Sequence, residues 1–314
     1  MKSFILSKLE NLTELMEFVL LDFADVPDLQ WLLFGLFLVI YIIIVMSNGL
    51  IFLITKLDPA LQTPMYFFLG NFSFLEICYV SVTLPRMLMN LSTQRRTISL
   101  VACATQMCCV LVLGAAECLL LTVMAYDRYM AICNPLHYPL VMSRKVCLQL
   151  VAGSWISGIP VQIGQTFQIF SLPFCGSHLI DHFFCDIPPI LKLLACGDTF
   201  VNEMMVYMVA VLIVTVPFLL ILMSYGKIIS TVLKLPSATS QARAFSTCSS
   251  HLTVVTLFFG SGILTYLRPK TSHSAGIDKV LSLSYTIVTP MFNPLIYSLR
   301  NKEVIAALRK LLCK

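Results

Sequence analysis

An acid and a base stand side by side at the end of a long apolar run. Asp127 and Arg128 follow an apolar stretch over 103–124. At about 1.5 Å per residue, that stretch is long enough to cross a bilayer as a helix. The pair therefore falls at a membrane interface, where charged side chains are costly and are usually functional. Asp127 and Arg128 are the first candidates for the working part of a membrane protein.

Two more acids lie in the middle of apolar runs. Glu76 and Glu117 must be protonated, paired or bound to a cation if they are buried in a membrane. Two such acids in neighbouring helices indicate an intramembrane sodium or proton site. The alternative is that both are neutral and hold helices together through hydrogen bonds to residues such as Asn48, Ser73 or Asn293.

A third group has the donor atoms of a metal site. His182, Cys185 and Asp186 offer an imidazole, a thiolate and a carboxylate within five residues, a set that can ligate copper or zinc. A disulfide at Cys185 would remove its thiolate from this set, so the metal hypothesis depends on the state of that cysteine.

The composition requires lipid as the main solvent. Hydrophobic residues make up 58% of the 314 residues and charged residues only 12%, which leaves too little polar surface for a soluble domain of this size. Seven apolar runs predict membrane-spanning helices, and Ser and Thr residues dilute the last two. These spans are 29–55, 64–89, 101–124, 146–167, 200–232, 244–267 and 280–299.

The charges at the two ends predict an odd number of spans. Residues 1–28 are acidic and contain a glycosylation sequon at Asn11, which indicates an extracellular segment. Residues 301–314 are mainly basic and are expected in the cytoplasm. Their apolar positions fall on one helical face, so they predict an amphipathic helix on the inner leaflet, next to Cys313 as a bystander or palmitoylated cysteine. A single membrane domain, 29–300, lies between these ends.

Four cysteines are expected on the oxidising side. Cys103 begins the third span, and Cys175, Cys185 and Cys196 lie in the longest loop. Two disulfides can form from these four, in any of three pairings. A bridge from Cys103 to the loop would fold that loop over the helices as a lid.

Proline interrupts the last span. Asn293 and Pro294 precede Tyr297 near its end, and proline removes a helical hydrogen bond. Such a site suits a segment that moves, whereas the alternative is the static kink common in membrane helices.

Other functional classes find less support in these residues. A transporter or channel would show inverted repeats or several charges along one route, and neither is seen. The chain lacks the HExxH, GxxxxGK and GxSxG motifs, so an intramembrane enzyme is not expected.

These residues together resemble the rhodopsin-like G-protein-coupled receptors. The resemblance rests on their order along the chain: Asn48, the acid Glu76, Cys103 with Cys185, Asp127-Arg128-Tyr129, Trp155, Pro217 with Tyr225, and Asn293-Pro294-Leu295-Ile296-Tyr297. Within that family, the segments 64–69, 124–138, 224–225 and 244–252 resemble olfactory receptors, and Leu136-His137-Tyr138-Pro139 resembles their tetrapod-type (class II) branch. A non-olfactory receptor of the same family is the nearest competitor.

The resemblance implies an all-α bundle of seven transmembrane helices with disulfides Cys103–Cys185 and Cys175–Cys196. It also implies a pocket for a small, mostly hydrophobic odorant, in which Tyr266 and Thr286 supply hydrogen bonds. The implied lining is Val110, Leu111, Gly114, Ala115, Val209, Ile213, Phe259, Ile263, Tyr266 and Thr286. Two positions depart from the family pattern: Glu76 replaces the usual aspartate, and Phe259 replaces a frequent tyrosine.

The resemblance further implies how the chain signals. Asp127 restrains Arg128 at rest, and on activation Arg128 moves with Tyr225 and Tyr297 to admit a G protein. The expected partners are an odorant, a stimulatory G protein of the olfactory type that raises cyclic AMP, and membrane lipid, with no nucleic acid. The expected location is the plasma membrane of olfactory sensory cilia.

Overall fold

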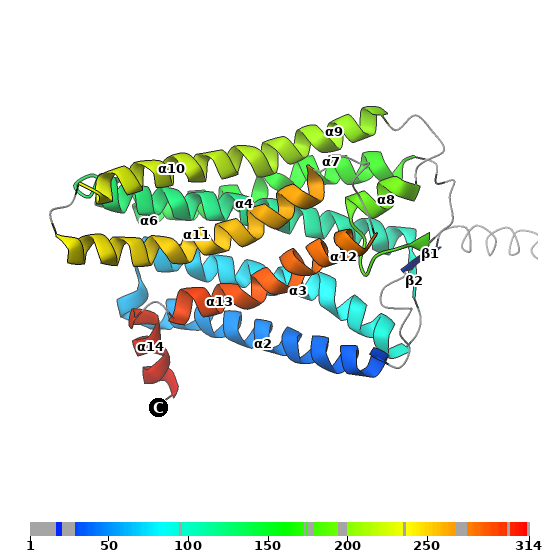
Figure 1. Ribbon diagram of the computed structural model, residues 1–314, viewed down its shortest axis with the longest axis horizontal. Coiled ribbons are helices and arrows are strands. Elements are labelled where there is room, and N and C mark those ends of the chain that lie inside the picture. Colours follow the sequence, from blue (N-terminus) through cyan, green and yellow to red (C-terminus); the bar gives the residue numbers. More distant parts are fainter. Residues whose placement is uncertain are drawn as a thin grey trace, which may run out of the picture.

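The computed structural model describes residues 17–20, 29–93, 96–172, 174, 179–193, 200–234, 237–267, 275–299 and 302–312. Seven long helical segments form one elongated bundle (Figure 1). They are α2 Gln30–Leu57, α3 Pro64–Thr93, α4 Leu100–Cys133, α6 Arg144–Ile156 with α7 Gly158–Phe170, α9 Phe200–Ala210 with η3 Val211–Thr215 and α10 Val216–Val232, α11 Ala238–Tyr266, and α12 Ala275–Leu283 with η5 Ser284–Val288 and α13 Thr289–Leu299.

The predicted membrane class and helix count are confirmed. Within the described residues, six helices are long and apolar enough to cross a membrane. The seventh segment, over 275–299, is divided into α12, η5 and α13, yet it packs beside α2 and α11. Large apolar side chains such as Trp31, Met46 and Leu212 are exposed on the outside of the bundle, where lipid would cover them.

Two of the long segments contain a wide π-helical turn. In η3, the N–H of Val216 donates to the carbonyl of Val211, five residues back, and Pro217 follows immediately. Proline has no N–H to continue the regular pattern, which explains why the backbone changes its spacing here. In η5, the N–H of Thr289 donates to the carbonyl of Ser284. Both turns lie at the depth of the cavity described below.

A small sheet closes one end of the bundle. Strand β1 (Glu17–Leu20) pairs antiparallel with β2 (Thr97–Ser99) and parallel with β3 (Leu179–Ile180). Phe18, Leu20, Ile98 and Ile180 are buried beneath it. The segment 179–193, which contains β3 and the short helix α8 (Ile187–Leu193), is called the lid. The sequence did not predict this sheet, although it did predict a loop folded over the helices.

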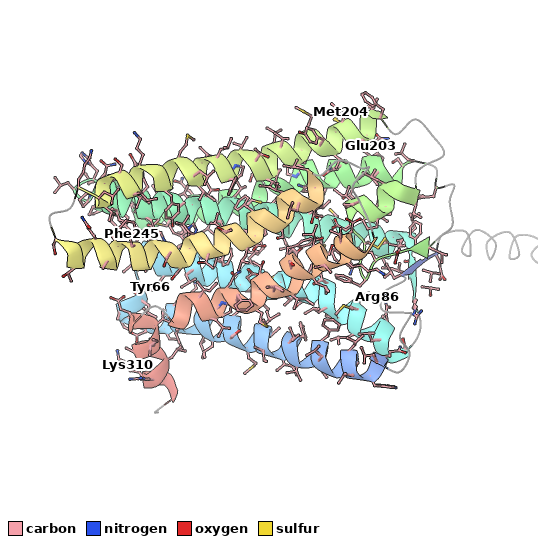
Figure 2. The ribbon with its side chains drawn as sticks, in the orientation of Figure 1. Tyr66, Arg86, Glu203, Met204, Phe245 and Lys310 are labelled. Carbon is pink, nitrogen blue, oxygen red and sulfur yellow. A yellow bond between two sulfur atoms is a disulfide. The ribbon has the colours of Figure 1, made fainter. Side chains whose placement is uncertain are left out.

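Helix α14 (Lys302–Leu312) lies at the opposite end and runs across the bundle axis (Figure 1). Val304 and Ala307 are buried against the bundle, while Arg309 and Lys310 are exposed. Tyr66 and Lys310 both lie at this end of the bundle (Figure 2). The Tyr66 hydroxyl donates to Glu303 at 2.7 Å, and Lys310 pairs with Asp58 at 3.4 Å. The predicted amphipathic helix therefore exists and is fastened to α3 and to the α2–α3 turn.

Candidate functional site

A cavity of about 80 Å³ lies inside the bundle, below the lid. Its walls come from α3, α4, α7, α9, η3, α11 and η5, and Ile187 at the start of α8 contributes from the lid. Most of the lining is apolar, so a ligand that enters exchanges water for hydrocarbon contacts. This volume fits a small organic molecule, and a larger ligand would require side chains to move.

All but two of the lining residues predicted from the resemblance face this cavity. The set comprises Val110, Leu111, Gly114, Ala115, Val209, Ile213, Phe259 and Tyr266. Ile263 and Thr286 do not line it. Ile263 packs against the hydrophobic core, and the Thr286 hydroxyl donates to the carbonyl of Ser282 at 2.5 Å. The structure therefore places Thr286 outside the cavity lining, whereas the neighbouring Tyr285 lines it.

The prediction also missed an entire wall. Gln162 and Gln165 on α7 line the cavity, as does Tyr79 on α3. The close approach of α7 to α4 depends on Gly158, because a β-carbon there would lie 2.9 Å from the Ala115 β-carbon. Two glutamines three residues apart in an apolar span were the available signal, since such residues share a helical face and polar groups in a membrane require partners.

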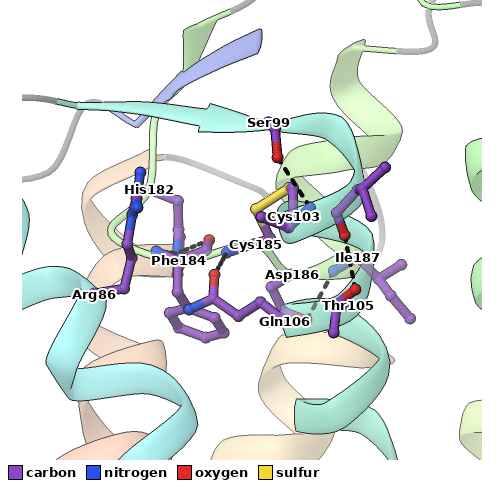
Figure 3. Close-up of a disulfide and its surroundings, with 12 residues drawn as sticks. Arg86, Ser99, Cys103, Thr105, Gln106, His182, Phe184, Cys185, Asp186 and Ile187 are labelled. Carbon is purple, nitrogen blue, oxygen red and sulfur yellow. Dashed lines mark hydrogen bonds between the residues drawn. A yellow bond between two sulfur atoms is a disulfide. The ribbon is translucent and has the colours of Figure 1, made fainter. Parts of the chain in front are cut away.

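A disulfide holds the lid over the cavity. Cys103, in the first turn of α4, is bonded to Cys185, and both are fully buried (Figure 3). The side chain of Gln106 accepts a hydrogen bond from the N–H of Cys185 at 3.0 Å and donates to the carbonyl of Val82 at 3.1 Å. The lid is thus tied to α4 covalently and to α3 through Gln106.

Asp186 fastens the lid to the other side of the bundle. Its carboxyl group accepts hydrogen bonds from the hydroxyls of Tyr285 at 2.6 Å and Tyr266 at 3.0 Å, and from the N–H of Ile187 at 2.7 Å. Burial raises the pKa of Asp186, although these three hydrogen bonds oppose the shift. Tyr266 and Tyr285 also line the cavity, so the same hydroxyl groups hold the lid and border the ligand space.

His182 lies beside this network. Its Nε2 is 2.9 Å from the Ser282 hydroxyl and its Nδ1 is 3.1 Å from the carbonyl of Phe184. The ring stacks on Phe183, with centroids 4.6 Å apart. Burial lowers the pKa of His182 to about 4, so the ring is neutral at physiological pH.

The three residues of the metal hypothesis are engaged elsewhere. Cys185 is in the disulfide, Asp186 binds two tyrosines, and His182 binds Ser282. In the part of the chain that the structure describes, no three His, Cys, Asp or Glu side chains gather in a way that could hold a metal ion. The geometry therefore gives the copper or zinc hypothesis no support, because the thiolate it needs is oxidised.

The two intramembrane acids do lie together. The carboxyl groups of Glu76 on α3 and Glu117 on α4 are close enough to interact electrostatically, and the Asn293 amide donates to Glu76. Both acids are almost completely buried. Asn48 instead donates to the carbonyl of Pro290, so it holds α2 to α13. Two carboxylates this close repel unless a proton or a cation lies between them.

The opposite end of α4 carries the Asp127 and Arg128 pair. Asp127 accepts a hydrogen bond from the Tyr138 hydroxyl at 2.9 Å, which ties α4 to the short helix α5 (Tyr138–Val141). Arg128 is buried and interacts electrostatically with Tyr225 and His251. Tyr225 and His251 in turn share a 2.8 Å hydrogen bond that connects α10 to α11. Arg128 therefore lies at the junction of three helices.

Some predicted residues fall where the structure gives no detail. Asn11, Cys175, Cys196 and Cys313 lie outside the described residues, as does the side chain of Tyr297 on α13. Tyr129 is described, and its ring stacks on Tyr126 with centroids 6.4 Å apart. Pro294 is buried in α13, next to the Asn293 that contacts Glu76.

Comparisons with known proteins identify the class to which this bundle belongs. The family model described as olfactory receptor matches residues 37–314. Olfactory receptor 10AG1 of Homo sapiens is 65% identical over 95% of this chain and 99% of its own length. Olfactory receptors 10A7 and 5A1 of the same species are 52% and 49% identical over 96% and 98% of this chain, and over 95% and 97% of their own lengths. The chain belongs to the olfactory receptor family: it is a seven-helix, G-protein-coupled odorant receptor and not an enzyme.

Proposed function

We propose that this receptor responds to small, uncharged, mostly hydrophobic odorants that occupy the cavity below the lid. The observation that carries the proposal is the cavity itself, with its largely apolar lining and with no Lys, Arg, Asp or Glu among its described lining residues. A charged ligand would lose its hydration there without gaining a counter-ion, which is strongly unfavourable.

The proposed partner is a stimulatory G protein of the olfactory type, which raises cyclic AMP. The junction of Arg128, Tyr225 and His251 supports a receptor that switches between two arrangements of α4, α10 and α11. An agonist that binds more tightly to one arrangement would shift the population toward it. Asp127, Tyr129, Asn293, Pro294 and Tyr297 complete the proposed switch.

The proposed location is the plasma membrane of olfactory sensory cilia, with the lid outside and α14 in the cytoplasm. The glycosylation sequon at Asn11 and the basic charge of α14 support this orientation. Membrane lipid covers the exposed apolar faces of the bundle. A mobility shift on deglycosylation that is lost in Asn11→Gln would support an external N-terminus.

A sodium ion or a shared proton is proposed between Glu76 and Glu117. The support is their proximity, together with one unpartnered oxygen on each carboxyl group among the described contacts. The Asn293 amide would help to hold Glu76 in place for the ion.

The test of the function uses cells that carry the olfactory stimulatory G protein. Cyclic AMP is measured against a panel of volatile compounds for the natural chain and for Arg128→Ala at equal surface level. A response that Arg128→Ala abolishes supports the proposal. A ligand-evoked current that survives Arg128→Ala, without a cyclic AMP response, would contradict it.

A further inference from the structure

The α7 wall of the cavity has hydrogen-bonding capacity that the receptor itself does not use. Gln162 and Gln165 are 3% and 6% exposed. Oε1 of Gln162 and Nε2 of Gln165 are buried, and neither has a hydrogen-bond partner among the described residues. Buried polar atoms in native proteins are nearly always paired with protein, water or ligand. Two unpaired amides on one wall of a ligand cavity therefore require an explanation.

The two amides are placed to act on the same group. They lie three residues apart on one helix, so their side chains share a face and their β-carbons are roughly 5–6 Å apart. Both line the cavity. The free Oε1 of Gln162 is an acceptor and the free Nε2 of Gln165 is a donor. If both amides flip by 180°, the donor and the acceptor exchange places. A single hydroxyl group both donates and accepts, which an ether, an aldehyde or a hydrocarbon cannot do.

The third glutamine of the series behaves differently. Gln168, one turn further along α7, donates to the side chain of Asn202 on α9 at 2.6 Å. It does not line the cavity. Gln168 therefore has a structural partner, whereas the two glutamines at the cavity do not. This contrast separates a helix-packing role from a ligand-binding role within one helix.

We propose that Gln162 and Gln165 form a polar subsite for the odorant and that this receptor selects compounds with a hydroxyl group, such as aliphatic alcohols, over apolar compounds of equal size. This inference rests on the proposed odorant function and adds the chemical class of the ligand. The hydroxyl donates to the carbonyl oxygen of one amide and accepts from the N–H of the other. The rest of the molecule occupies the apolar space beside Val110, Val209 and Phe259. A site with unpaired polar groups discriminates strongly against an analogue that leaves them unpaired.

The test compares ligands that differ only in the polar group. The probes are an alkanol and the methyl ether, alkanal and alkane with the same number of non-hydrogen atoms. Potency is measured as cyclic AMP in cells. Binding is measured separately, as the rise in melting temperature (Tm) of the purified full-length receptor. We expect the alkanol to be the strongest of the four in both measurements. Gln162→Leu and Gln165→Leu should each weaken the alkanol roughly fivefold to tenfold and leave the alkane unchanged or stronger.

The matched control is Gln168→Leu, which makes the same substitution on the same helix. It should lower the Tm of the empty receptor, because the bond to Asn202 is lost, and it should leave the preference for the alkanol intact. Gln162→Leu and Gln165→Leu should leave that Tm unchanged or raise it, because each removes an unpaired buried amide. A lower Tm in these two variants would assign them a structural role and overturn the inference.

The outcomes also separate this inference from the proposed function. Cyclic AMP responses that do not distinguish the alkanol from the alkane would leave the receptor function standing and would overturn the subsite. Stabilisation by the alkanol that needs both glutamines, without cyclic AMP, would support the subsite and count against the proposed coupling. If no probe stabilises the receptor more than the alkane does, the amides bind only water, and the inference is wrong.

Discussion

The Tyr285 hydroxyl donates a 2.6 Å hydrogen bond to Asp186, and this bond joins the lid to the last membrane segment directly beside the cavity. Tyr285 lies in the π-helical turn η5, and Asp186 directly follows the disulfide-bonded Cys185. Tyr285 therefore lines the cavity and also holds the lid in place. A ligand that contacts Tyr285 can for this reason affect the position of the lid.

Removing this hydroxyl should loosen the lid. Tyr285→Phe keeps the ring but leaves Asp186 with fewer donors, which should cost about 1–2 kcal/mol of stability because the acceptor is buried. The measurement is the Tm of the purified receptor. Tyr207→Phe, on the exposed face of α9, is the control and should leave Tm unchanged. An equal Tm for Tyr285→Phe and the natural chain would show that the bond contributes nothing.

Acid should destabilise the receptor through His182. The pKa of His182 in the folded chain, about 4, lies below the ordinary 6.5 because the ring is buried. The stability that depends on the neutral ring is therefore complete above pH 6.5 and is lost as the pH falls toward 4. The total loss is about 3 kcal/mol by linkage.

The comparison for this prediction is Tm at pH 7 and pH 5 in the natural chain and in His182→Gln. The variant lacks the titrating ring, so its Tm should fall less between the two values. Asp186 is present in both proteins and cancels from the difference. Parallel loss of Tm in the two proteins would rule out His182 as the source.

Filling the cavity from α4 should abolish the odorant response without unfolding the receptor. A β-carbon at Gly114 meets no atom within 4 Å, and Gly114 lines the cavity. Gly114→Leu places a side chain in the ligand space, and stability should hold because Leu favours a helix over Gly by about 1 kcal/mol. Cyclic AMP potency should fall more than tenfold at equal surface level. The control is Gly164→Leu: a β-carbon at Gly164 also meets no atom within 4 Å, but this residue lies outside the cavity. The Gly164→Leu receptor should respond to the odorant like the natural chain.

The acid pair should make basal signalling sensitive to sodium. A cation between Glu76 and Glu117 would stabilise the resting arrangement, so replacing sodium with N-methylglucamine should raise basal cyclic AMP. Glu117→Gln removes one charge and should abolish that rise. The control is Glu203→Gln at the start of α9, which also removes one carboxylate but lies outside the acid pair. It should leave the sodium response unchanged. If basal cyclic AMP of the natural chain does not change when sodium is replaced, the two acids share a proton instead of binding sodium.

The helices were predictable because their signal is local. An apolar run such as 30–57 can satisfy its backbone in a membrane only as a helix, so its sequence alone determines its structure. The π-helical turns were not predicted, although Pro217, which follows η3, was a local signal for a change of helical spacing. Strand β1 was also missed: four residues at 17–20 carry little signal, and their partners lie far away in the chain.

The cavity lining could be predicted at the positions that the family resemblance supplied. Gly114, Val209 and Ile213 follow that pattern and face the cavity. Gln162 and Gln165 were missed because the fourth span was not considered part of the pocket, although two glutamines in an apolar helix are a physical signal. Thr286 lies within the π-helical turn η5, whose spacing differs from the regular helical period, and it does not face the cavity.

The parallel pairing of β1 with β3 also sets an order of events during synthesis. Val19 pairs with Leu179, so 160 residues (179 − 19) separate the two partners. At roughly 5–20 residues per second, the ribosome needs about 10–30 s between them. During that interval four membrane segments are made. Strand β1 can pair with β2 as soon as residues 97–99 are in place, but its other edge must wait for β3. Phe18 and Leu20 of β1 are buried in the folded chain, so their burial is complete only when the lid is in place. A strand made early in synthesis thus completes its pairing only after the fourth membrane segment has been made.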